Sequence, residues 1–169
     1  MIDREQFFTK YRKEFGSLSQ TQVEGIEAIL NEWESNYSDQ DIRWLAYILA
    51  TARHETDATM QPIEEYHKGR HKLYGSRHKM DGSKYYDTDN IFYGRGFVQL
   101  TWYENYERAG LDLGLDLIHN PEQAMEPSNA AKILIKGMVE GWFTTKHLST
   151  YFNETRTNPI NARAIVNGK

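Results

Sequence analysis

The first third of the chain places its apolar residues at helical spacing. Aromatic side chains recur three and four positions apart: Phe8, Tyr11 and Phe15. Gly16 follows them, and glycine commonly ends a helix. Ser19 and Gln22 have the spacing of a capping box, so a second helix is predicted to begin there. The apolar face of that helix is marked by Val23, Ile26, Leu30 and Trp33.

A third helix is predicted to run from about residue 39 to the His-Glu-Thr sequence at 54–56. Ser38 is placed to cap it, and Asp39 and Asp41 in the first turn favour the positive end of the helix dipole. Apolar residues at helical spacing give it a buried face: Ile42, Leu45, Ala46, Leu49 and Ala50. We therefore expect this face to be buried.

The second half of the chain contains three further helical patterns. One covers residues 102–113, and a short one covers residues 161–166. The third is predicted to start with Ser128 as its cap. Its apolar stripe consists of Ala131, Leu134, Met138 and Trp142.

The middle of the chain interrupts this helical pattern. Pro62 ends the helical stretch, and residues 66–90 are rich in Gly, Lys, Asp and Tyr, which predicts a loop with short extended pieces. No repeat, low-complexity tract or linker divides the sequence. We therefore expect a mostly α fold of the α+β type, built as one globular domain over residues 1–169 with a small β element and a cleft.

The composition narrows the possible functions. The net charge of −4 argues against nucleic-acid binding, and the absence of cysteine removes disulfides and thiolate zinc sites. The first fifteen residues are charged throughout, and no apolar run approaches the ~20 residues that a membrane span needs. We expect a protein that is made in the cytoplasm without a signal peptide, does not insert into a membrane and acts as a monomer.

The charge is distributed unevenly along the chain. Residues 67–84 carry six Lys and Arg against one Asp, while residues 1–66 carry six against thirteen acidic residues. This basic segment is either a solvated loop or a contact for an anionic polymer. His67, His71 and His78 lie within it at spacings of four and seven, but glycines and cations among them argue against a metal site. No cofactor or metal is expected.

The sequence FYGRGFVQLTW at 92–102 combines side chains that neither a buried strand nor a simple turn needs. Its glycines allow a tight turn and a close approach to a ligand. Tyr93 and Trp102 are candidates to contact a polar, ring-shaped ligand, and Gln99 can donate and accept hydrogen bonds at once. Arg95 has two readings, either a ligand contact or a partner for a nearby carboxylate that braces the loop.

Three carboxylates are candidates for acid–base chemistry. Glu55 lies at the end of the predicted apolar helix, and Glu64 and Glu65 follow Pro62. Hydrolysis of a glycosidic bond usually uses two carboxyl groups held in different environments, one protonated and one ionised. Glu55, at the edge of a buried helix, suits the role of the protonated general acid. A glutamate in the loop suits the role of the ionised base. The alternative is that Glu55 merely ends a helix and the other two lie in a solvated turn.

The sequence also resembles a known family. His-Glu-Thr at 54–56, YGRGFVQLTWYENY at 93–106 and INARAIVNGK at 160–169 are similar to motifs of the family 19 glycoside hydrolases, the chitinase-like enzymes with a lysozyme-type fold. The resemblance extends from about residue 39 to the end. The lack of cysteines and the short loops are similar to the compact bacterial and phage members, many of which are cell-wall endolysins.

The resemblance implies roles for individual residues. Glu55 is implied as the general acid, and Glu64 or Glu65 as the base, with no means of choosing between the two. The positions implied to hold the attacking water or contact the substrate are His54, Tyr93, Arg95, Gln99, Thr101, Trp102, Asn105, Arg163 and Asn167. The sequence departs from the family where small residues usually follow His-Glu-Thr, because Asp57 stands there and is close enough to shift the pKa of the acid.

Two polymers fit this expectation. Chitin is neutral, whereas peptidoglycan carries peptide carboxylates, which a basic segment beside the catalytic loop would attract. The leading hypothesis is a glycosidase that cleaves β-1,4 bonds between N-acetylated sugars of the bacterial cell wall, acting there after its release from the cell. Chitinase activity by the same mechanism is the main alternative. A lytic transglycosylase and a non-catalytic wall-binding module are further alternatives.

Overall fold

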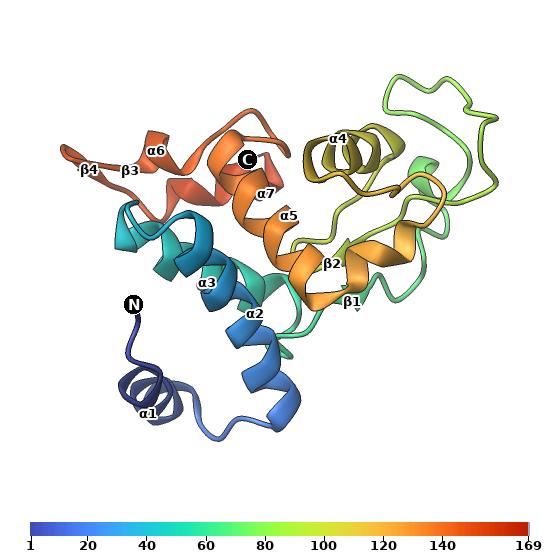
Figure 1. Ribbon diagram of the computed structural model, residues 1–169. Helices are drawn as coiled ribbons and strands as arrows, with labels where there is room; N and C mark the ends of the chain where they lie inside the picture. The colour runs from blue at the N-terminus through green and yellow to red at the C-terminus, as the bar shows by residue number, and fades with distance from the viewer. Residues whose placement is uncertain (169) are drawn as a thin grey trace.

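The computed structural model describes residues 1–168, and they form a mainly helical fold (Figure 1). The N-terminal half contains α1 (Arg4–Phe15), α2 (Gln20–Asn36) and α3 (Ile42–Glu55). The second half contains α4 (Tyr103–Leu113), α5 (Pro127–Glu140) and two single-turn helices, α6 (Leu148–Tyr151) and α7 (Ala164–Asn167). The prediction of a mostly α fold with a small β element is confirmed.

The β structure consists of two antiparallel pairs of very short strands. β1 (Ile63–Glu64) pairs with β2 (Arg95–Gly96), and β3 (Phe152–Asn153) pairs with β4 (Arg156–Thr157). Short 3-10 helices occur at η1 (Leu73–Gly75), η2 (Pro121–Met125) and η3 (Asn161–Arg163). Apart from η1, the predicted loop at 66–90 forms no helix, so that prediction is also confirmed.

The predicted helix starts are partly correct. Gly16 ends α1 with φ of 89°, and Ser19 and Gln22 form the capping box of α2. The assignment of Ser38 as a cap is wrong, because the Asp41 side chain caps α3 by accepting from the Arg43 amide. Ser128 is also not a cap. α5 begins one residue earlier at Pro127, whose fixed φ suits the first helical position.

The core is continuous from α1 to α7 and is densest where α2 packs against α5. Its largest fully buried side chains include Trp33, Phe92, Phe97 and Tyr106. α2 also approaches the loop that follows α3 closely, since a Cβ on Gly25 would lie 1.7 Å from the Met60 carbonyl oxygen. A side chain at this position would therefore push the loop after Glu55 out of place.

The helices divide the remaining elements into two groups. α6, β3 and β4 lie on one side of α5, and the long loop of residues 66–90 lies with α4 on the other side, while α7 overlaps α5 in this view (Figure 1). No helix of residues 1–168 combines the length and the apolar character needed to cross a membrane. The predicted site residues lie in two different surroundings, one around Glu55 and one around Arg95.

Candidate active site

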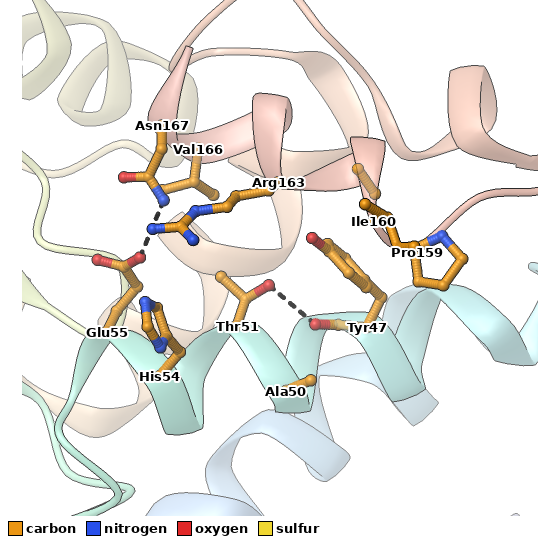
Figure 2. Close-up of a pocket in the computed structure, with 11 residues that line it drawn as sticks. Tyr47, Ala50, Thr51, His54, Glu55, Pro159, Ile160, Arg163, Val166 and Asn167 are labelled. Atoms are coloured by element: carbon orange, nitrogen blue, oxygen red, sulfur yellow. Dashed lines mark hydrogen bonds between the residues drawn. The ribbon is translucent and has the colours of Figure 1, made fainter. Parts of the chain in front are cut away.

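Glu55 lies in a pocket between α3 and the C-terminal segment. One face of α3 supplies Tyr47, Ala50, Thr51, His54 and Glu55, which recur at helical spacing. The opposite wall is formed by Pro159, Ile160, Ala162, Arg163, Val166 and Asn167. The pocket has a volume of about 230 Å³, and Figure 2 shows the carboxylate of Glu55 at one end of it. Two segments more than a hundred residues apart thus meet around a single carboxylate.

The position of Glu55 follows from how α3 ends. The next residue, Thr56, is fully buried, and its hydroxyl donates to the Ala52 carbonyl at 2.7 Å and accepts from the Met60 amide at 3.1 Å. The intervening backbone turns through positive φ at Asp57 (51°) and Ala58 (62°), a region that L-residues enter at a cost. Thr56 therefore fixes the end of the helix while the chain reverses direction.

Four predicted site residues meet in this pocket. Glu55 and His54 come from α3, and Arg163 and Asn167 come from the C-terminal segment. The Asn167 amide donates to Glu55 at 3.4 Å, a long hydrogen bond, and the Arg163 guanidinium points across the pocket toward the same carboxylate (Figure 2). Glu55 is half-buried, while the other three are exposed. This end of the site is therefore exposed to solvent, and among residues 1–168 only a long hydrogen bond joins its two walls at Glu55.

Glu64 is held by several groups at once. It lies opposite Arg95 in the β1–β2 pair. The Tyr93 hydroxyl donates to its Oε1 at 2.7 Å, Lys68 Nζ lies 3.2 Å from Oε2, and Arg95 Nε lies 3.6 Å from Oε1. The hydrogen bond from Tyr93, assisted by the two cations, lowers the pKa of Glu64. Glu64 is therefore ionised at neutral pH.

Glu65 has different partners. The Tyr74 hydroxyl donates to its Oε1 at 3.0 Å, and the Gly94 amide donates to its Oε2 at 3.3 Å. The Tyr74 ring in turn packs edge-on against Trp102, with 5.3 Å between the ring centroids. Burial, together with the bond to Glu65, raises the pKa of Tyr74 to about 12. The sequence analysis missed Tyr74, which lies in an irregular loop without periodicity.

Tyr93 and Arg95, both implied as substrate contacts, are buried in the structure. The Arg95 guanidinium stacks 3.8 Å from the centroid of the Tyr93 ring, and each residue is less than 10% exposed. Arg95 Nη1 donates to the Tyr106 hydroxyl at 3.0 Å and to the Ile91 carbonyl at 3.1 Å. Because Arg95 covers a face of the Tyr93 ring, a sugar cannot stack there. The bracing interpretation of Arg95 is the one that these contacts support.

The rest of the motif closes a tight turn. Gln99 has φ of 54°, and its amide donates to the Ile63 carbonyl at 2.9 Å. The Thr101 hydroxyl donates to the Gln99 carbonyl at 2.7 Å, and the Asn105 amide donates to the Thr101 carbonyl at 2.7 Å. All of these side chains and Trp102 remain half-buried. They are candidates for substrate contact, but their bonds also hold the turn against β1.

Comparisons with known proteins identify the family of the chain. A sequence model of the chitinase class I family, glycoside hydrolase family 19, matches residues 35–152. Acidic endochitinase SP2 of Beta vulgaris is 31% identical over 144 residues, which cover 78% of this chain and 44% of that protein. A 31-residue stretch, 18% of this chain and 10% of the relative, is 55% identical to inactive chitinase-like protein 1 of Hevea brasiliensis. The chain spans less than half the length of these curated relatives.

Solved structures show the same fold. Chitinase C of Streptomyces griseus superposes with a TM-score of 0.60 at 19% identity, covering 95% of this chain and 64% of that one. A bacterial family 19 chitinase gives a TM-score of 0.51 at 25% identity, covering 95% and 74%. The matched family region contains all three candidate carboxylates and the turn at 92–102, while residues 159–167 lie beyond it. The chain belongs to the chitinase class I family, glycoside hydrolase family 19.

Proposed function

We propose that the protein is a glycosidase that cleaves β-1,4 bonds between N-acetylated amino sugars of peptidoglycan, with Glu55 as its general acid. The observation that carries the proposal is the placement of Glu55. Its carboxylate ends a buried helix and opens into a pocket whose opposite wall supplies Arg163 and Asn167. Family membership sets the expected chemistry.

The proposed reaction uses two carboxyl groups. Protonated Glu55 donates to the oxygen of the leaving sugar as the glycosidic bond breaks, and an ionised carboxylate removes a proton from the attacking water. Glu64 and Glu65 are the candidates for that second group. Glu55 is half-buried and opens into the pocket, where its carboxyl group can reach a bound glycan.

The basic loop supports peptidoglycan as the substrate. Within it Lys68 pairs with Glu64, and Arg77 pairs with Asp89. Arg70 and Lys72 are exposed and form no ion pair within residues 1–168. Free cations attract an anionic polymer and give no advantage on a neutral one. The proposal includes action on the cell wall after release from the cell.

Chitin is the second candidate substrate. Acidic endochitinase SP2 of Beta vulgaris and chitinase 8 of Oryza sativa are named as chitinases, and both compared structures are chitinases. A chitinase would use the same acid and the same pocket. Peptidoglycan and chitin therefore differ in how strongly the exposed cations attract them. The chemistry of cleavage is the same for both.

Digestion of purified murein and colloidal chitin side by side tests the proposal. We expect faster release of products from murein, with reducing ends detected by mass spectrometry. Anhydro ends would instead indicate a lytic transglycosylase, and turnover of chitin alone would indicate a chitinase. Binding without turnover of either polymer would indicate a non-catalytic module and contradict the proposal.

The contribution of the exposed cations can be measured separately. The double variant Arg70→Gln/Lys72→Gln should bind intact walls about tenfold more weakly at low salt, because it weakens the attraction to an anionic polymer. The difference should fade above ~0.1 M salt, where the screening length is ~10 Å. Lys10→Gln/Lys13→Gln on α1 removes the same charge from another surface and serves as the control in the co-sedimentation assay.

Activity on short soluble oligosaccharides completes this test. The loop variant should keep its parental rate on them, since they carry no extended anionic surface. Equal losses on walls and on oligosaccharides would show that the loop shapes the site, and would remove the electrostatic support for peptidoglycan.

A further inference from the structure

The segment that joins Glu55 to β1 has a strained backbone. It consists of residues 56–62, between the end of α3 and the first strand. The residues with positive φ in it are Asp57 (51°), Ala58 (62°) and Met60 (52°), none of which is glycine. Such conformations are unfavourable for L-residues and persist only where surrounding contacts hold them. The path of the chain away from Glu55 therefore depends on what packs against the 56–62 segment.

The first two turns of α2 supply such contacts from outside the segment. The side-chain amide of Gln22 donates to the Ala58 carbonyl at 3.0 Å. The side-chain amide of Gln61 donates in the other direction, to the Thr21 carbonyl of α2. These two bonds attach the segment to α2 near both of its ends.

Gly25 allows α2 to come close enough to form these bonds. It is buried and lies three positions after Gln22, so both residues are on the same face of the helix. A Cβ on Gly25 would lie 1.7 Å from the Met60 carbonyl oxygen and 2.7 Å from Gln61 Nε2. Met60 is itself fully buried, so the segment cannot easily move aside. Any side chain at this position would displace α2 or the 56–62 segment.

These α2 residues lie outside both the family match and the pocket. The match to the chitinase class I family begins at residue 35, after Gln22 and Gly25. Neither residue lines the pocket around Glu55. They contact the backbone that leads from Glu55 to the glutamates at 64 and 65, and so they can act on the reaction only through that backbone.

We infer that Gln22 and Gly25 are positioning residues for the glycosidase reaction. They hold the 56–62 segment and thereby fix Glu55 relative to the strand that follows. Hydrolysis of a glycosidic bond depends on the spacing of its two carboxyl groups, and a displacement of about 1 Å can lower a rate by ~10²-fold. This inference rests on the proposed function, because it takes Glu55 as the general acid.

Two substitutions separate this role from the stability of α2. Gln22 also belongs to the capping box, where its side-chain oxygen accepts from the Ser19 amide at 2.8 Å. Gln22→Glu keeps an acceptor for that amide but, when ionised, has no donor for the Ala58 carbonyl. Ser19→Ala weakens the cap and leaves the bond to Ala58 in place.

The two variants should differ in catalysis and in local opening. Gln22→Glu should lose about tenfold in kcat on the polymer that the parent cleaves, with KM within about twofold, because the pocket walls are unchanged. Hydrogen exchange of the amides in residues 56–62 should become faster in the same variant. Ser19→Ala should keep the parental kcat and the parental exchange of this segment, while its melting temperature falls by roughly 2–4 °C.

Gly25→Ala tests the close approach of α2, and Gly110→Ala on α4 is its matched control. Both positions are buried helical glycines that face a backbone carbonyl, since a Cβ on Gly110 would lie 2.7 Å from the Leu115 carbonyl oxygen. Both substitutions should lower the melting temperature. Only Gly25→Ala should also lower kcat, by at least about tenfold, when the assay is run well below the melting temperature.

Several outcomes would overturn the inference. They are parental kcat in Gln22→Glu or in folded Gly25→Ala, equal losses of kcat in Gln22→Glu and Ser19→Ala, and unchanged exchange of residues 56–62 in Gln22→Glu. If Gly25→Ala does not fold, Gln22→Glu beside Ser19→Ala decides the question. A parent without turnover on murein or chitin would remove the proposed function, and the positioning role with it. Parental turnover combined with failure of these variants to differ would remove the positioning role alone.

Discussion

The two halves of the candidate site are built in contrasting ways. Around Glu55 the neighbouring polar groups are exposed, and a single hydrogen bond of 3.4 Å joins α3 to the C-terminal segment at the carboxylate. Around Arg95 the side chains are buried, stacked and bonded to the core. The first half leaves room for a ligand, whereas the second half leaves little.

This contrast separates the chemistry of the site from its support. The turn at 92–102 has the longest and most unusual sequence pattern in the chain, but its most unusual residue, Arg95, contacts other protein groups. Glu55 is marked in the sequence by its place at the end of an apolar helix and by the His-Glu-Thr motif. The turn at 92–102 thus supports membership of the family, whereas the proposal that Glu55 is the acid rests on where its carboxylate opens.

The largest loss of stability is expected around Arg95, where the side chains are buried and bonded to the core. Arg95→Ala removes a buried guanidinium that contacts Tyr93 and Tyr106 and balances the charge of Glu64. Leaving its buried hydrogen-bond partners unsatisfied typically costs about 1–3 kcal/mol of unfolding free energy. Urea denaturation of Arg95→Ala and of Arg108→Ala, an exposed arginine on α4, gives the comparison. Similar urea midpoints for Arg95→Ala and Arg108→Ala would show that Arg95 does not stabilise the fold.

A smaller effect on stability, this time a gain, is expected in the turn that follows Glu55. Ala58 has φ of 62° and is held there by bonds of its amide to Arg53 and of its carbonyl to Gln22. Glycine adopts this conformation without the penalty that alanine incurs, so Ala58→Gly should stabilise the protein by about 1 kcal/mol.

The control for this substitution is Ala46→Gly, in the middle of α3. Glycine there should destabilise by about 1 kcal/mol, because the helix favours alanine. For a chain of this size, thermal melts should show shifts of roughly 2–4 °C in opposite directions. Destabilisation by both substitutions would mean that the turn after Glu55 is not strained.

The smallest effect on stability is expected on the open side. Asn167 is exposed and makes one long bond to Glu55, so Asn167→Ala should change the unfolding free energy by less than about 0.5 kcal/mol. Thermal melting of this variant beside Arg95→Ala measures the contrast between the two halves. A loss above about 1 kcal/mol of unfolding free energy in Asn167→Ala would show that Asn167 holds the pocket wall in place. The surroundings of Glu55 would then not be weakly bonded.

The sequence predicted those parts of the fold that local patterns encode. The periodicity of α1 to α3, Gly16 and the capping box at Ser19 are local, and they were predicted correctly. The caps assigned to Ser38 and Ser128 were wrong because a serine near a helix start competes with better-placed residues, here Asp41 and Pro127.

The site depends on contacts that local patterns do not encode. The wall formed by residues 159–167 reaches Glu55 only through tertiary packing, and Tyr74 reaches Glu65 from an irregular loop. The sequence offered the bracing role of Arg95 as one of two alternatives, but it did not predict that Tyr93 is buried. Glu64 and Glu65 also have different partners, which their adjacent positions in the sequence do not predict.

The most direct test of the account is the turnover of Glu55→Gln on purified murein, measured beside the parent and Glu154→Gln, which removes an exposed carboxylate from the β3–β4 turn. Glutamine keeps the shape of the side chain and cannot supply the proton, so kcat should fall by at least ~10²–10⁴-fold with an unchanged melting temperature. Glu154→Gln should keep the parental rate. A Glu55→Gln protein that melts like the parent and still cleaves at a comparable rate would contradict the assignment of Glu55 as the acid.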